Sequence, residues 1–67
     1  MKTKVVKQLD KDYYIQMKQL APEYEAFFEL KKKGWLWDSV VAWSESQEKL
    51  DEHYHWIMNN IDSYNNM

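Results

Sequence analysis

The clearest hydrophobic pattern lies in the C-terminal part of the chain. Large side chains recur there at alternating spacings of three and four residues, interrupted only by the polar Gln47. At about 100° per residue, this spacing places them on one face of an α-helix. Asp38 or Ser39 suits the N-cap, and Asn65 and Asn66 suit the end. The pattern predicts a helix over residues 39–64, whose core-facing stripe is Val40, Trp43, Gln47, Leu50, Tyr54, Ile57, Ile61 and Tyr64.

A second, shorter helix is predicted to begin at Pro22, because the first helical turn does not need the N–H group that proline lacks. Glu23 and Glu25 follow, and the lysine run 31–33 comes last, so both signs of charge favour the helix dipole. Gly34 suits the left-handed position that ends a helix. The apolar side would be Tyr24, Phe27, Phe28 and Leu30. Because the link that follows is short, the two helices should pack antiparallel.

The first twenty residues fit two patterns. As a helix, they present a stripe at spacings of three and four that runs from Val6 to Leu20. As a hairpin, TKVVKQL and YYIQMKQ flank the turn LDKD. The absence of glycine from that turn weakens the hairpin, whereas paired valines and paired tyrosines favour it. We prefer a helix over residues 10–20 and keep the hairpin as the alternative.

These elements predict an all-α fold, a small helical bundle in which the long C-terminal helix packs antiparallel to the shorter one. The alternative is an α+β fold with an N-terminal β-hairpin over residues 3–19. Either fold is a single small domain over residues 1–67, without a linker or a second domain. A chain of this length has a small core, and here eleven aromatic residues rather than disulfides would supply it, since cysteine is absent.

Composition also bears on origin and location. The chain contains no signal peptide and no long apolar run, which predicts a soluble, cytoplasmic protein. Met1 and the last residues are typical of a complete small reading frame. All nine basic residues are lysine, and asparagine and tyrosine are frequent. This bias is typical of AT-rich coding DNA and indicates a low-GC bacterium or a phage.

Four tryptophans within residues 35–56 raise the question of whether all of them are core. Trp43 lies on the predicted stripe. Trp56 lies nearly opposite it, in a sector shared with Val41 and His55, while Trp35 and Trp37 sit in the turn, where one could close the end of the bundle. Trp56 is either covered by the N-terminal segment, or exposed as an anchor for a partner protein, or buried in a homodimer.

Three glutamates form a second candidate feature. Glu45, Glu48 and Glu52 are three or four residues apart, so they would follow one exposed ridge of the long helix. The ridge is either a solvated face or a negative surface that docks on a basic patch of another protein, where complementary charge speeds encounter and selects partners.

Other functions have less support. His53 and His55 would point about 200° apart on a helix, so they cannot bind one metal ion together. No cysteine and few hydroxyl groups accompany the histidines, so we expect no catalytic residue, no cofactor and no enzyme activity. The formal net charge is −2 and arginine is absent, which argues against direct binding of nucleic acid.

The sequence thus favours a small protein-binding regulator or inhibitor, phage-encoded or bacterial, that acts on a host or cellular protein. An enzyme that processes nucleic acid would present the basic patch that such an acidic surface fits. The alternatives are a structural homo-oligomer and a small DNA-binding protein. The predicted partner-binding residues are Trp56, His55, Val41, Glu45, Glu48, Glu52 and Trp37.

Overall fold

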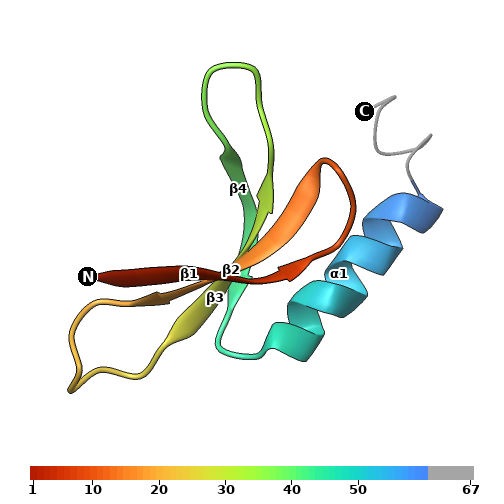
Figure 1. Ribbon diagram of the computed structural model, residues 1–67. Helices are drawn as coiled ribbons and strands as arrows, with labels where there is room; N and C mark the ends of the chain where they lie inside the picture. Colours follow the sequence, from red (N-terminus) through yellow and green to blue (C-terminus); the bar gives the residue numbers. More distant parts are fainter. Residues whose placement is uncertain (61–67) are drawn as a thin grey trace.

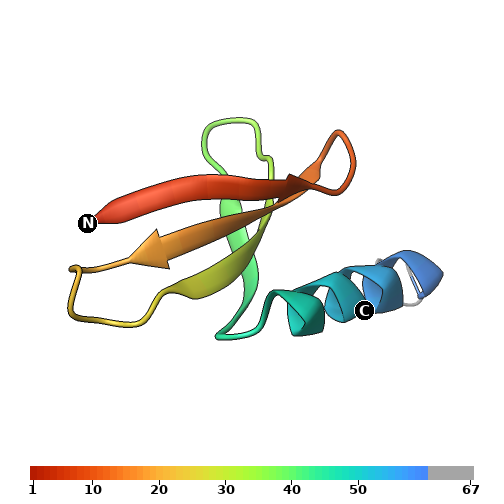
Figure 2. The ribbon, with the colours of Figure 1, turned by 60° about the horizontal axis from the view of Figure 1, so that its bottom comes forward.

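The computed structural model describes residues 1–60, which form a four-stranded antiparallel sheet followed by one helix (Figure 1). The strands lie in chain order across the sheet, and the helix lies against one face of it (Figure 2). The fold is therefore α+β, and the predicted helical bundle is wrong. The elements are β1 (Lys2–Gln8), β2 (Tyr13–Gln19), β3 (Phe27–Lys32), β4 (Ser39–Ser44) and α1 (Gln47–Asn59).

The N-terminal segment adopts the hairpin alternative, and the preferred helix over residues 10–20 is wrong. Its turn needs no glycine because the carboxylate of Asp10 organises it. Asp10 Oδ1 accepts the backbone N–H groups of Asp12 at 2.7 Å and of Tyr13 at 2.8 Å. An aspartate side chain that accepts hydrogen bonds from backbone N–H groups two and three residues later stabilises a turn without glycine.

The helix predicted to begin at Pro22 is also absent. Residues 27–32 form β3, which pairs with β2 from Tyr13–Lys32 to Lys18–Phe27. The sequence FFELKK alternates along the strand, so that Phe28 and Leu30 face α1 while Phe27 and Glu29 face the other way. Pairing with two neighbouring strands outweighs the helix-like charge pattern at the two ends of this segment.

The long C-terminal helix is shorter than predicted and begins at Gln47 rather than Ser39. Residues 39–44 form β4, where two adjacent β-branched valines suit a strand. Asp38 does not cap a helix but accepts the backbone N–H of Gly34 and the hydroxyl of Tyr14. The stripe holds within α1, where Leu50, Tyr54 and Ile57 face the sheet. The last predicted stripe residues, Ile61 and Tyr64, and the end signal Asn65 and Asn66 lie outside the described residues.

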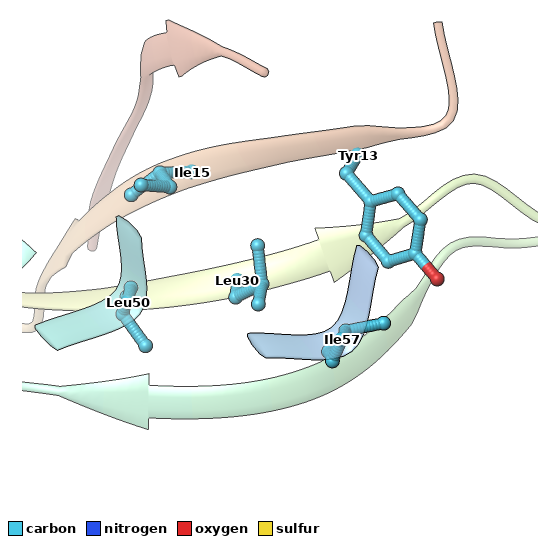
Figure 3. Packing of buried hydrophobic residues seen from close by; sticks show 5 residues of the cluster. All are labelled: Tyr13, Ile15, Leu30, Leu50 and Ile57. Atoms are coloured by element: carbon cyan, nitrogen blue, oxygen red, sulfur yellow. The ribbon is translucent and has the colours of Figure 1, made fainter. Parts of the chain in front are cut away.

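The core lies between α1 and one face of the sheet (Figure 3). Leu50 and Ile57 of the helix lie over Ile15 of β2 and Leu30 of β3, and all four are at most 2% exposed. Tyr13 closes one end of this cluster, with its ring edge-to-face against Tyr54 at 5.5 Å between centroids. The helix is thus attached to the sheet by a small set of fully buried side chains, against which Val41 and Ala42 of β4 also pack.

Polar contacts fasten α1 to the first hairpin as well. The hydroxyl of Tyr54 donates a hydrogen bond of 2.6 Å to Asp10 Oδ2, the second oxygen of the carboxylate that organises the turn. This bond is the main cause that lowers the pKa of Asp10, and together with burial it raises the pKa of Tyr54 to about 12. Lys7 of β1 and Asp51 of α1 form an ion pair of 2.9 Å nearby.

We predict that Leu30→Ala lowers the free energy of unfolding by about 2–5 kcal/mol, because it leaves a cavity at the centre of the only described helix–sheet contact. Urea unfolding followed by circular dichroism measures the change. Trp56→Ala is the matched control; its side chain is exposed, so the change should stay within about 0.5 kcal/mol. Equal effects of the two substitutions would contradict this core.

We predict that Tyr54→Phe lowers the free energy of unfolding by about 1–3 kcal/mol at neutral pH, through loss of the bond to Asp10. The folded-state pKa of Tyr54 is raised. The stabilisation that its hydroxyl provides is therefore complete below the ordinary tyrosine pKa of about 10 and disappears as the pH rises toward 12. The difference between wild type and variant, measured by urea unfolding, should shrink over that interval. A difference that does not change with pH there would refute this assignment.

Candidate functional site

The sheet face opposite α1 carries a row of side chains from neighbouring strands. The register places Gln16 of β2, Glu29 of β3 and Trp43 of β4 side by side. Because side chains alternate along a strand, this row points away from the face that holds Ile15, Leu30 and Ala42. The helix covers only that other face (Figure 2), so α1 does not block access to the exposed member of this row, Trp43.

A pocket of about 390 Å³ opens at one end of this row. Antiparallel strands run in opposite directions, so the start of β3 lies beside the end of β4. The pocket therefore combines residues that precede and begin β3 with residues that end and follow β4. Its lining consists of Glu25, Ala26, Phe27, Glu29, Trp43 and Glu45.

Two aromatic rings form the apolar part of the pocket. Phe27 and Trp43 meet edge-to-face, with 6.1 Å between centroids and 79° between planes. Trp43 is nevertheless 66% exposed, so its ring is held on one edge and open to solvent elsewhere. A large aromatic side chain that is both positioned and accessible is typical of binding surfaces.

Glu29 is the charged residue at the base of this surface, and it is only 7% exposed. Lys18 Nζ lies 3.2 Å from Glu29 Oε1. This ion pair lacks hydrogen-bond geometry, however, and Oε1 accepts no hydrogen bond from any of residues 1–60. A buried carboxylate oxygen without a donor is costly in free energy.

Glu25 and Glu45 add negative charge at the rim. Neither takes part in the two ion pairs found among the described residues, which join Lys7 to Asp51 and Lys18 to Glu29. The pocket lining therefore holds three carboxylates, of which only the deepest has a lysine beside it. The pocket is suited to bind a cation that also has apolar or planar surface.

The structure distributes the predicted partner-binding residues over several places rather than one helical surface. Trp56 is 53% exposed on the outer side of α1, stacked on His53 at 6.1 Å. His55, Glu48 and Glu52 are exposed on the same helix. Glu45 is not on the helix at all: it lies between β4 and α1 and lines the pocket, so the continuous ridge of three glutamates is wrong.

Two further predicted residues lie elsewhere. Val41 packs against the core and is partly buried. Trp37 lies in the loop between β3 and β4, which projects from the body of the molecule (Figure 1) and is anchored by the bonds of Asp38. Trp35 and Trp37 are both exposed there, so neither closes the end of the core. A side chain at Gly34 would run into the carbonyl oxygen of Trp37, which explains the glycine in this loop.

The sequence did not reveal Phe27, Glu29 and Trp43 as surface residues, because their segments were predicted to be helices. The available signal was the two-residue period of FFELKK, which places one phenylalanine and the glutamate together on one strand face. For Trp43 the signal was the pair of valines before it, which favours a strand.

Comparison of the chain with protein-family models, with curated proteins and with solved structures gave no match. Within residues 1–60, no helix has the length and apolar character needed to cross a membrane. The same part of the chain contains no group of three or more histidine, aspartate or glutamate side chains placed to hold a metal ion.

Proposed function

We propose that this protein is a small regulator or inhibitor that binds another protein through the acidic and aromatic surface centred on Trp43. The proposal keeps the acidic and aromatic character that the sequence indicates but moves the contact from the long helix to the uncovered face of the sheet. The partner would be a host or cellular protein.

The observation that carries the proposal is the exposed ring of Trp43 beside Phe27, with carboxylates around both. Tryptophan is enriched among the few residues that dominate binding energy in protein interfaces, because one ring buries a large area at little entropic cost. Charged residues at the edge of such a contact add selectivity and speed rather than bulk affinity. Glu25 and Glu45 occupy this position at the pocket rim.

The sign of the charge indicates the kind of partner. An acidic surface attracts proteins with a basic patch and repels acidic ones, nucleic acids included. Basic patches are common on proteins that bind nucleic acid, so an enzyme that processes nucleic acid is a suitable target. The protein would then act by covering that patch.

The test is comparative affinity capture from a lysate of the source cells, with wild-type protein, Trp43→Ala and Trp56→Ala as baits. We expect wild type and Trp56→Ala to retain the same protein and Trp43→Ala to lose it, since the anchoring ring is gone. Retention by Trp43→Ala together with loss by Trp56→Ala would place the contact on α1 and contradict the proposal.

Sedimentation equilibrium of the same three proteins separates this function from the homo-oligomer alternative. That alternative has a structural basis, because β4 is an edge strand and its sequence SVVAWS has neither the lysines that mark the edge strand β1 nor a proline. We expect the mass of a monomer for all three. A dimer that dissociates on Trp43→Ala would assign this surface to self-association instead.

A further inference from the structure

We propose that the pocket between Phe27 and Trp43 binds the guanidinium group of an arginine side chain on the partner protein. This inference rests on the proposed function and specifies what the acidic and aromatic surface recognises. It follows from the chemistry of the lining, from the position of Glu29 at the base of the pocket and from the charge around the pocket.

The lining matches a flat cation. A guanidinium group stacks on aromatic faces and donates several N–H bonds in one plane, often two to a single carboxylate. The pocket offers the partly exposed ring of Trp43 for stacking and three carboxylates as acceptors, within about 390 Å³. An ammonium group is more strongly hydrated and cannot stack, so it would use less of this lining.

Glu29 places a negative charge at the base of the pocket. It is more than nine-tenths buried and lines the pocket, yet its Oε1 accepts no hydrogen bond from any of residues 1–60. Oε1 itself is shielded from solvent and has Lys18 beside it, so a guanidinium group in the pocket would meet the negative charge of the Glu29 carboxylate rather than bind that atom.

Lys18 acts as an internal competitor in this arrangement. Its ammonium lies 3.2 Å from Glu29 Oε1 without forming a hydrogen bond, so it neutralises part of the charge that the arginine would meet. Removal of this lysine should therefore strengthen binding, whereas removal of the glutamate charge should weaken it. The two substitutions should thus change the affinity of the pocket for a guanidinium group in opposite directions.

The chain itself contains no arginine. A second copy of this protein therefore cannot supply the guanidinium group, and the occupant must come from a different protein.

The test is a ¹H–¹⁵N NMR titration of the full chain with a short acetylated peptide that has one arginine flanked by glycine and serine. The matched probe replaces arginine by citrulline, which has the same shape without the charge. We expect the arginine peptide to shift the indole Nε1–H signal of Trp43 in a saturable way and to leave that of Trp56 in place. The citrulline peptide should bind at least about tenfold more weakly.

Variants then test the roles of the charged residues. Glu29→Gln should weaken binding by about three- to tenfold, and Lys18→Met should strengthen it by a similar factor. Glu52→Gln removes the same charge from the exposed side of α1, outside the pocket, and should leave binding unchanged. Glu45→Gln tests the rim at an exposed position where folding is not at risk, and should weaken binding in the same direction as Glu29→Gln.

Three results would overturn the inference: equal binding of the citrulline peptide, a Trp43 signal that does not move, or equal weakening by Glu52→Gln and Glu29→Gln. Its failure differs from failure of the proposed function. If the arginine peptide does not bind but Trp43→Ala still loses the captured protein, only the arginine assignment falls. If Trp43→Ala also retains that protein, both proposals fall.

Discussion

The packing of Leu50 and Ile57 against Ile15 and Leu30 is the interaction on which the rest of the structure depends. A four-stranded sheet of this size has two faces, and a single helix of thirteen residues can cover only one of them. Because the helix presents its apolar stripe to one face of the sheet, the sheet gains a buried face there. The other face has no helix over it, and there Trp43 remains exposed while Glu29 is buried among its neighbours.

The candidate site follows from that asymmetry. Trp43 and Phe27 are not part of the hydrophobic core, because they lie on the face that the helix does not cover. Strand pairing nevertheless fixes their positions relative to Glu29. The sheet thus acts as a rigid support that holds an aromatic ring and carboxylates in one arrangement. Preorganisation of this kind lowers the entropic cost of binding, since few side chains need to be ordered when a partner arrives. It is also the reason that the proposed contact lies on strands rather than on the exposed side of α1.

The sequence alone supports part of this account. The stripe Leu50, Tyr54 and Ile57 was predicted correctly because three-and-four spacing over several turns is specific to a helix. The strands were not predicted where short apolar runs fit both the helical period and the two-residue period of a strand. Val40 and Trp43 are three residues apart, which joined them to the helical stripe by coincidence, and the charges flanking residues 27–30 resembled helix caps. The turn at Asp10 depends on side-chain hydrogen bonds and on Tyr54, which lies 44 residues away, so local pattern could not reveal it.

Errors in the candidate site came from the same source. Glu45 was selected for its charge, but its neighbours Glu29 and Trp43 became visible only with the strand register. The most direct test of the account is a methyl NOESY spectrum of the full chain. We predict cross-peaks that join the methyl groups of Leu50 and Ile57 to those of Ile15 and Leu30, and none that join them to the Trp43 indole. Contacts of the Trp43 indole with Leu50 or Ile57 would place that ring in the core and contradict the account.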